Sequence, residues 1–374
     1  MNPEFPPEVE EFRAEVRHLL KDYLDMGGFF VHEGENVERK AQLYRELGQR
    51  NWLALAWPPE VGGLGKSPMY EFVLWDEMAY ARAARPPLGP GIVAKTIIGY
   101  GNDDQKERFL PGLRAGEIFF SLGYSEPEAG SDLGGVRTRA RRDGDVYVVN
   151  GEKRWTSGGH RADYLWTLCR TGTLESHSRG LTVLIIERRS PGISISPIPS
   201  LDGERFNEIR FDDVEVPVAN RVGEEDGAWN MIVESLATER HVQFSPKRVQ
   251  RDFEDLLEHL REVGKTDDPV VRRQVADLAV ELAEVHALSL GMLEAVEKGR
   301  NAVVEAAFNK LAGSELCQKI AQAAVEHGAP EALVEGTMVE FLWRQSISET
   351  IGGGTSEVMR GVIARNHLGL SARR

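Results

Sequence analysis

The sequence has little of what an extracellular or membrane protein needs. Its 374 residues include only two cysteines, Cys169 and Cys317, too few for a disulfide framework or a thiolate metal site. No apolar run is long enough to span a bilayer. The acidic N-terminal stretch lacks the apolar core of a signal peptide. These absences predict a protein of the reducing cytoplasm, without a membrane span.

Positive charge is also scarce. Lysine and arginine number 45 against 59 acidic residues, which gives a net charge of -14. A chain of this charge offers no basic face to nucleic acid or to an anionic membrane, so we expect neither as a partner. Hydrophobic residues at 41% and charged residues at 28% are ordinary for a globular protein, and the length favours two or three domains.

The pattern of apolar residues changes twice along the chain. Helical spacing governs the first part, from Val9, Phe12, Val16, Leu19 and Leu20 to a helix near residues 67–84. Alternating and β-branched segments punctuated by glycine and proline follow, as in residues 146–150 and 181–186. The helical pattern then returns, with one long stripe through Val271, Val275, Leu278, Leu282, Val285 and Leu293. Helices, strands and helices in this order predict an α+β protein. Its expected domains are helical over 1–117, an antiparallel β domain over 118–225, and a helical bundle over 226–374.

Two segments of the β region carry polar and small residues suited to a flat ligand. The first loop, residues 123–132, reads Gly-Tyr-Ser-Glu-Pro-Glu-Ala-Gly-Ser-Asp and combines hydroxyls with close backbone approach. The second loop, residues 150–159, reads Asn-Gly-Glu-Lys-Arg-Trp-Thr-Ser-Gly-Gly. If it continues a strand, Trp155 and Ser157 project to the same face. Taken alone, each loop is more typical of a turn between strands, and Trp155 of a core aromatic.

A third segment near the C-terminus, residues 351–360, reads Ile-Gly-Gly-Gly-Thr-Ser-Glu-Val-Met-Arg. The three segments together, in this order and spacing, resemble the acyl-CoA dehydrogenase family. The stretches 100–111 and 211–217 resemble that family's entry to and exit from the β domain, so the resemblance covers nearly the whole chain. It implies the family fold, with a four-helix bundle at the C-terminal end.

The resemblance also implies a cofactor, a substrate and an electron acceptor. It predicts FAD, an acyl-CoA thioester, and reoxidation by an electron-transferring flavoprotein. The positions matching flavin contacts are Leu122, Tyr124, Ser125, Trp155, Ser157, Thr355 and Glu357. Ser131 matches a position that meets the CoA moiety.

The catalytic base cannot stand where many family members have it, because that position is Gly353. Glu349 lies four positions earlier, and we expect it on the surface of the preceding helix. Glu239 is the better candidate. The helix after Gly227 carries Trp229, Ile232, Val233, Leu236 and Ala237, and at roughly 100° per residue Glu239 lies about 20° from Ile232. Burial there would raise the pKa of its carboxyl group.

The isovaleryl- and long-chain types of the family carry their base in a Glu-Arg pair like Glu239-Arg240. The resemblance therefore implies that Glu239 removes the α-proton and that Arg240 meets the substrate. The backbone N–H of Gly353 could polarise the thioester carbonyl without a side chain. Without the family resemblance, the pattern would favour Glu239 as an ordinary helix-flank glutamate paired with a neighbouring arginine.

Two segments depart from the family's pattern. Homo-oligomeric members bind the adenine-pyrophosphate part of FAD with an Arg-x-x-Phe-Gly and a Gln-x-x-Gly-Gly segment of a neighbouring subunit. Here residues 260–265 lack the phenylalanine, and residues 322–330 lack the paired glycines. The double loss resembles the heteromeric α2β2 enzymes of actinobacterial steroid side-chain degradation. We therefore expect a tetramer in which a second, related subunit supplies contacts to FAD.

Two other functions remain open from the residues alone. A flavin monooxygenase or oxidase of the same fold would show rapid reoxidation of its reduced flavin by air. A non-catalytic subunit that completes a partner's FAD site would not need Ser125, Trp155, Ser157 and Glu239. The acyl group is undetermined, although the run Gly352–Gly354 leaves space for a branched or bulky one.

Overall fold

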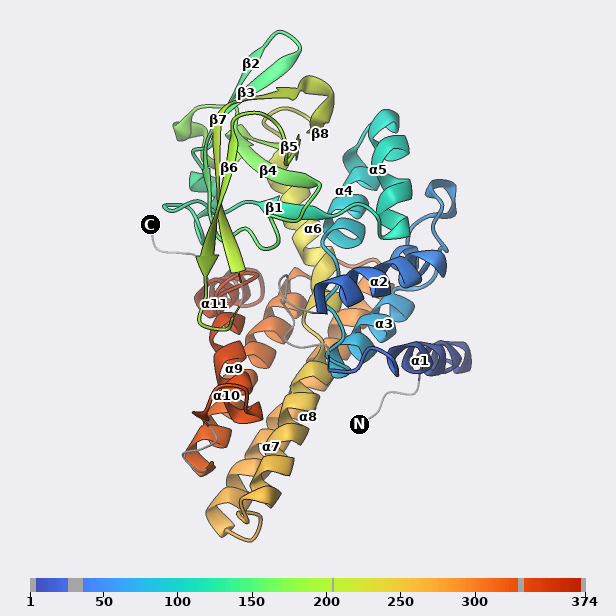
Figure 1. Cartoon of the computed structure of the whole chain (residues 1–374), viewed down its shortest axis with the longest axis vertical. Helices are drawn as coiled ribbons and strands as arrows, with labels where there is room; N and C mark the ends of the chain where they lie inside the picture. Colours follow the sequence, from blue (N-terminus) through green and yellow to red (C-terminus); the bar gives the residue numbers. More distant parts are fainter. Residues whose placement is uncertain (1–4, 26–35, 204, 329–332, 371–374) are drawn as a thin grey trace. The chain divides into compact units, whose positions relative to one another are not determined.

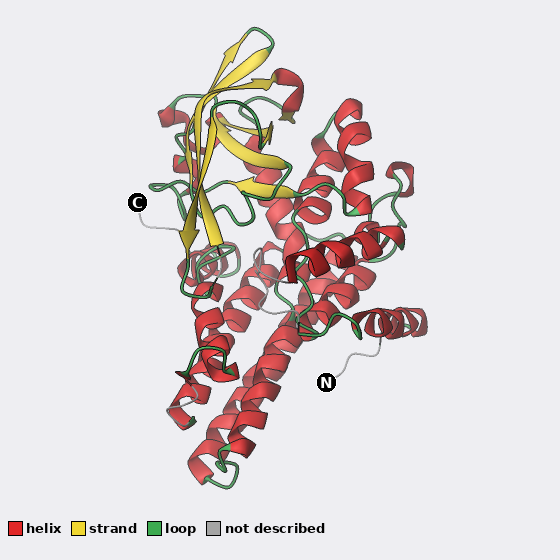
Figure 2. Cartoon of the chain, in the orientation of Figure 1, coloured by secondary structure: helices red, strands yellow, loops and turns green. Residues whose placement is uncertain are grey.

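The computed structural model describes residues 5–25, 36–203, 205–328 and 333–370, and the side chains of residues 236–241 are outside this description. Contacts group the chain into two compact units, each built from segments far apart in the sequence. The helical unit comprises residues 1–29, 67–85 and 240–374, and the sheet unit comprises residues 30–66 and 86–239. The order helices, strands, helices confirms the predicted fold class (Figure 2).

The helical unit is built from helices that come from both ends of the chain. They are α1 (Pro7–Leu20), α3 (Pro68–Tyr80), α7 (Pro246–Glu262), α8 (Pro269–Glu297), α9 (Val303–His327), α10 (Met338–Glu349) and α11 (Ser356–Asn366). Helices α7 to α10 pack against one another and form the bundle seen in Figure 1. The predicted stripe lies inside, because Val271, Leu278 and Val285 are buried with Leu256, Leu316 and Ile320 in one apolar cluster.

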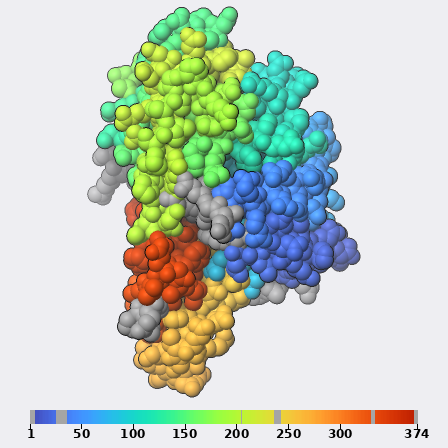
Figure 3. All heavy atoms as spheres, viewed as in Figure 1, coloured from blue at the N-terminus to red at the C-terminus, as the bar shows by residue number. Residues whose placement is uncertain are grey.

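The helices of the sheet unit are α2 (Asn36–Gln49), α4 (Ala94–Tyr100) and α5 (Asp103–Ala115). Its strands are β1 (Phe120–Gly123), β2 (Arg139–Asp143), β3 (Val146–Lys153), β4 (Tyr164–Arg170), β5 (Leu181–Glu187), β6 (Ile193–Pro199), β7 (Arg205–Pro217) and β8 (Arg221–Val222). Helix α6 (Ala228–Gln243) follows and runs on into the helical unit. In Figure 3 the strands β2 to β7, green to yellow-green, form one closely packed body.

One sheet joins the strands in the order β6-β7-β3-β2-β4-β5-β8. Most neighbouring strands are antiparallel, as predicted, but β1 runs parallel to β4 along residues 120–123 and 164–167. The predicted antiparallel pairing therefore holds for most of the sheet, and β4 is the exception, because it pairs in parallel with β1 and, at Arg139 and Arg170, with β2. The mixed arrangement places the end of β1, where the first loop starts, beside the interior of the sheet unit.

The sheet buries apolar side chains on both faces. Tyr147, Val149, Leu165 and Ile186 are in a cluster between the strands. Trp166, Val183 and Ile185 face a second cluster that includes Ala228 and Ile232 of α6 and residues of α4 and α5. Strands covered on both faces form a rigid base for the loops that leave them. None of the helices in the described ranges combines the length and apolar character needed to cross a membrane.

Candidate active site

The first loop leaves β1 and folds back at once on itself. The amide of Glu126 donates to the carbonyl of Ala129 at 3.0 Å, and the amide of Ala129 donates to the carbonyl of Glu126 at 3.2 Å. Ser125 is half-buried, while Gly130 and Ser131 are exposed. The loop therefore has an anchored beginning and an accessible end, which includes the position predicted to meet CoA.

The Glu126 carboxylate anchors the loop. One oxygen accepts the Arg137 amide at 2.7 Å, and the other accepts the Thr138 amide at 2.8 Å. That second oxygen also binds the Nζ of Lys153 at 2.8 Å. Burial alone would raise the pKa of Glu126, but Lys153 and these donors lower it. The carboxylate therefore stays ionised and holds the loop to the start of the next strand.

Lys153, at the end of β3, brings the second loop to the first. Its ammonium group is fully buried and also donates to the carbonyl of Tyr124 at 3.1 Å. Next to it, the amide of Arg154 donates to the carbonyl of Ser125 at 2.8 Å. We call this set of contacts between residues 124–126 and 153–154 the lysine clamp. The two predicted cofactor loops are thus directly bonded to each other within the sheet unit.

Trp155 does not continue the strand, contrary to the sequence-based expectation. β3 ends at Lys153, and Trp155 adopts a left-handed backbone with φ of 61°. A non-glycine residue in this region is strained, and such strain is concentrated at functional sites. The indole is 52% exposed, packs edge-on against Phe206 at 6.0 Å between ring centroids, and has the Arg154 guanidinium 5.6 Å from its own centroid. Trp155 is therefore a surface aromatic rather than a core residue.

The backbone beyond Trp155 is fixed on both sides. Thr156 exchanges two hydrogen bonds with the buried Asn207 of β7, at 3.0 and 2.8 Å. The carbonyl of Ser157 accepts from the Ser121 hydroxyl at 2.5 Å. A β-bulge between β3 and β7 occurs at Gly151, whose φ is 146°. A Cβ there would lie 2.7 Å from Thr138 Cα, so only glycine fits.

Leu122 and Tyr124 turn their side chains inward. Both pack on the apolar cluster around Trp166, and the Tyr124 hydroxyl accepts the Trp166 indole N–H at 3.0 Å. Burial raises the pKa of Tyr124, so the phenol stays neutral. Any flavin contact at these two positions is therefore expected through the backbone, whereas Ser125, Trp155 and Ser157 are on the accessible side. All five predicted positions lie close together in the sheet unit.

The remaining predicted cofactor positions are in the helical unit, after a turn of glycines. This glycine turn, residues 351–354, follows α10 and leads into α11, which Thr355 caps by accepting the Val358 amide at 3.2 Å. Gly353 has a φ of 68° and is exposed. An added Cβ would lie 3.0 Å from the Cζ of Phe244. The backbone therefore passes very close to an aromatic ring at the position where a catalytic side chain would start.

Glu349 is buried, so the expectation of a surface position is wrong. Its carboxylate binds Arg248 and, at 2.6 Å, Arg85. Burial alone would raise the pKa of Glu349, but the two arginines lower it to about 2. A carboxylate shared by two arginines is a poor proton acceptor, which supports its exclusion as the base.

Helix α6 carries the predicted base. The first half of α6 packs in the sheet unit, where Ala228, Met231 and Ile232 are buried in the apolar cluster around Trp166. Val233, expected on the apolar face, is 44% exposed. The side chains of Glu239 and Arg240 lie outside the described residues, so both assignments remain predictions. What is established is that position 239 falls within a continuous helix that ends at Gln243.

A depression of about 930 Å³ lies between α8, α9, α10 and α11. Thr355 and Glu357 line it, together with Gln322, the first residue of one of the diverged segments. Its charged lining residues are Asp277, Glu281, Glu315, Lys319, Glu326, Glu357 and Arg360. The lining is acidic, which disfavours an anion such as a pyrophosphate.

Family models match three consecutive stretches of the chain. The N-terminal domain of acyl-CoA dehydrogenase matches residues 6–117, the middle domain 121–214 and the C-terminal domain 226–368. The chain belongs to the acyl-CoA dehydrogenase family. Members of this family are flavoprotein oxidoreductases that work with FAD. The family resemblance read from residues 123–132, 150–159 and 351–360 is confirmed.

Similar proteins extend over the full length of this acyl-CoA dehydrogenase family member. Acyl-CoA dehydrogenase FadE26 of Mycobacterium tuberculosis is 36% identical over 99% of both chains. A solved structure described as the Tcur3481-Tcur3483 steroid ACAD has a TM-score of 0.89 and 32% identity over 100% of both chains. The ChsE4-ChsE5 complex from Mycobacterium tuberculosis gives a TM-score of 0.87 and 34% identity, again over 100% of both chains. These two structures are heteromeric complexes.

Sequence reasoning missed the residues that hold the site together. The sequence pattern shows Lys153 and Glu126 only as members of their loops, and it gives Arg85 and Arg248 no predicted role. A signal for the clamp existed, because the only lysine of the two short polar loops has glutamates beside it in both of them. The arginines around Glu349 had none, because their partner is 264 residues away from Arg85.

Proposed function

We propose that this chain is an FAD-dependent dehydrogenase that converts an acyl-CoA thioester to the 2-enoyl-CoA. FAD supplies the acceptor for the hydride that leaves the β-carbon. The observation that carries the proposal is the lysine clamp, which bonds both predicted flavin loops to each other and leaves their polar ends accessible.

The geometry of the loops fits a flat, polar cofactor. Trp155 offers an exposed aromatic face on a constrained backbone. The Thr156 hydroxyl is buried and has no hydrogen-bond partner among the described residues, an arrangement that calls for a missing polar group. We expect Ser125, Trp155 and Ser157 to contact the flavin with their side chains, Leu122 and Tyr124 with backbone atoms, and Thr355 and Glu357 to contribute from the helical unit.

The proton chemistry is assigned to Glu239. Removal of the α-proton needs a carboxylate, and the glycine turn has none, since Gly353 carries no side chain and Glu349 is held by two arginines. We therefore assign the base to Glu239 on α6, with Arg240 and Ser131 meeting the substrate, and the support for this is the resemblance of the Glu239-Arg240 pair to that of the isovaleryl and long-chain types. The exposed Gly353 N–H would then stabilise the oxygen of the thioester as negative charge develops.

The substitution Glu239→Gln tests this assignment against a control on the same helix. Glu234 is exposed and bonds the Tyr100 hydroxyl, so Glu234→Gln changes an equivalent charge away from the proposed chemistry. Anaerobic bleaching of the flavin by an acyl-CoA should slow by ~10²–10⁴-fold in Glu239→Gln and stay near wild type in Glu234→Gln. Normal bleaching in Glu239→Gln would show that the base is elsewhere.

A heteromeric assembly is the quaternary structure that we propose. Both solved relatives above are two-protein complexes by their descriptions. In this chain the depression beside the diverged segment is acidic, which supports the idea that a different subunit completes the FAD site in an α2β2 tetramer. We expect the protein purified alone to hold FAD poorly. Full FAD occupancy and activity of the isolated chain would disprove the heteromer.

We propose a bulky acyl group, such as a steroid side chain, with an electron-transferring flavoprotein as acceptor. Gly352 and Gly353 are exposed and lack side chains, so the turn leaves room beside the reactive carbons. A panel of octanoyl-CoA, isovaleryl-CoA and the CoA thioester of a steroid acid ranks the candidates by bleaching rate. Preference for octanoyl-CoA would contradict the bulky substrate without affecting the reaction type.

A further inference from the structure

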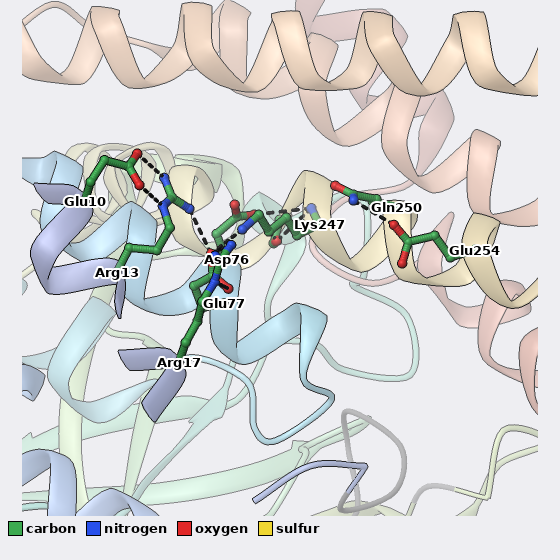
Figure 4. A network of polar contacts seen from close by, with 9 residues as sticks. Glu10, Arg13, Arg17, Asp76, Glu77, Lys247, Gln250 and Glu254 are labelled. Atoms are coloured by element: carbon green, nitrogen blue, oxygen red, sulfur yellow. Dashed lines mark hydrogen bonds and ion pairs between the residues drawn. The ribbon is translucent and has the colours of Figure 1, made fainter. Parts of the chain in front are cut away.

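The first turn of α7 is held by acidic residues of α3. Asp76 accepts the Ser245 hydroxyl at 2.5 Å and the Lys247 amide at 3.2 Å. The neighbouring Glu77 binds Lys247 and, at 2.9 Å each, Arg13 and Arg17 of α1 (Figure 4). This network fixes the beginning of α7 within the helical unit from one side.

Arg248, in the same turn, makes the connection on the other side. It binds the carboxylate of Glu349, the last residue of α10, and Arg85 binds the same oxygen. Arg248 and Glu349 are both less than one-tenth exposed. A buried carboxylate with two cationic partners has little freedom to move. If it separated from either arginine, that arginine would keep a buried charge without a counter-ion.

A second contact joins the same two segments. Phe244, directly before the start of α7, has its carbonyl held by the Asn309 amide at 3.1 Å. Its ring faces Gly353, close enough that an added Cβ would be at 3.0 Å. Residues 244–248 therefore meet residues 349–353 twice, once through an ion pair and once through an aromatic contact.

The glycine turn needs such support from its flanks. Three successive glycines have no side chains to pack, and glycine loses more conformational freedom on folding than other residues. On the far side Thr355 fixes the start of α11. On the near side, Glu349 is held by Arg248 and Arg85, and the Thr350 hydroxyl accepts the Gln318 side-chain amide at 3.1 Å.

We propose that Glu349 is a positioning residue whose pairs with Arg248 and Arg85 set where the glycine turn presents the Gly353 N–H. This inference rests on the proposed role of that N–H in the dehydrogenation. In this proposal Glu349, which lies near the family's usual base position, holds the glycine turn in place and does not transfer a proton.

The test compares Glu349→Gln with Glu77→Gln in the assembled, FAD-loaded protein. Glu77 is a matched control, because it is also a buried carboxylate whose pKa its cationic partners lower to about 2 despite burial, and no residue of the glycine turn contacts it. The probes are octanoyl-CoA, isovaleryl-CoA and a steroid-acid CoA thioester. Hydrogen exchange of the peptide covering residues 350–358 reports the turn itself.

For Glu349→Gln we expect a fall in kcat of about tenfold or more with a smaller change in KM, because a shift of the donor affects the reacting geometry most. Exchange in residues 350–358 should accelerate. Glu77→Gln should melt at a lower temperature, yet change kcat and the exchange of that peptide much less than Glu349→Gln does, because Arg248 and Glu349 stay paired.

A loss of stability in Glu349→Gln without a change in kcat or in exchange would reduce Glu349 to a structural residue and overturn the proposal. If that variant does not fold, Arg85→Gln decides, since Arg248 still neutralises Glu349 and the same peptide and kcat can be followed. If the wild type bleaches with none of the probes, the proposed function fails, while the exchange comparison still judges the positioning role.

Discussion

The two units anchor their functional segments in different ways. In the sheet unit, the lysine clamp uses residues within one short stretch, from Tyr124 to Arg154, and most of its bonds involve backbone groups. In the helical unit, the glycine turn depends on side-chain ion pairs between distant segments, such as Arg85 with Glu349. One anchor is local and joins one ion pair mainly to backbone groups, and the other is long-range and joins charged side chains to one another.

The difference shows what each anchor can tolerate. Backbone hydrogen bonds survive most substitutions because they need no particular side chain, so the cofactor loops depend on only one ion pair. The glycine turn lacks side chains and must be held by its neighbours, so its position depends on several charges at once. We therefore expect one substitution to disrupt the sheet unit strongly, and acid to act mainly on the helical unit.

The largest effect should come from Lys153→Met. This change leaves Glu126 buried without its cation, and breaking a buried pair costs about 3–5 kcal/mol. The carbonyl of Tyr124 loses its donor at the same time. Urea unfolding should show the loss of stability, and the flavin spectrum should show release of FAD from both loops.

A second substitution separates charge from shape at this clamp. Glu126→Gln keeps the shape of the side chain and removes its charge, although one of the two oxygens that accept the Arg137 and Thr138 amides becomes a donor NH2 group. The double variant Lys153→Met/Glu126→Gln should still be more stable than the sum of the single changes predicts, because no charge is left buried alone. Simple additivity would mean that Lys153 and Glu126 do not act as a pair.

Acid should weaken the helical unit through Glu77 and Glu349. Burial would raise both pKa values, but arginine and lysine partners lower each from 4.5 to about 2. Because the folded-state pKa lies below the unfolded one, each group stabilises the protein above about pH 4.5, and this contribution disappears as the pH falls toward 2. Each Gln variant should lose about 3 kcal/mol at neutral pH and show a flatter pH dependence in urea unfolding.

If the Gln variants kept the wild-type slope below pH 4.5, other carboxylates would govern acid unfolding. The helical unit would then not differ from the sheet unit in its sensitivity to acid through these two carboxylates, although the ion pairs themselves would remain.

Sequence patterns alone were enough for the fold class and the loops. The helical stripe through Val271, Leu278 and Val285 is buried as predicted, because a 3.6-residue period directly encodes one face. The first and second loops can be recognised because glycine, hydroxyl and charged residues are concentrated in two short segments of the sequence. Family resemblance then linked them to a cofactor.

Other features depend on tertiary structure, and local sequence patterns do not predict them. Trp155 leaves the strand because Lys153 turns into the interior and the next backbone amide bonds Ser125, which a strand pattern cannot show. The sequence pattern predicts a surface position for Glu349 because its two arginine partners are distant in the sequence, Arg248 in α7 and Arg85 in the loop after α3. Val233 fits an apolar period yet is exposed, since periodicity does not say where a covering element ends.

A smaller effect is expected from Gly353→Ala. Alanine at a φ of 68° costs about 1–2 kcal/mol, and its Cβ would press on the Phe244 ring. Gly352→Ala is the matched control, because the nearest atom to its Cβ is 3.7 Å away. Thermal unfolding and kcat should fall in the first variant and change little in the second. Equal behaviour would argue against close packing of Phe244 on the turn.

The smallest effect should come from Thr355, where two roles coincide. Its hydroxyl caps α11, so Thr355→Ala should cost about 1 kcal/mol. Thr355→Ser keeps the hydroxyl and should restore both stability and FAD affinity. Thr355→Asp keeps the cap acceptor but has no hydroxyl to donate, so it should restore stability alone. If Thr355→Asp also binds FAD normally, Thr355 acts only as a cap, and the cofactor is held by the locally anchored loops of the sheet unit rather than by the glycine turn's far end.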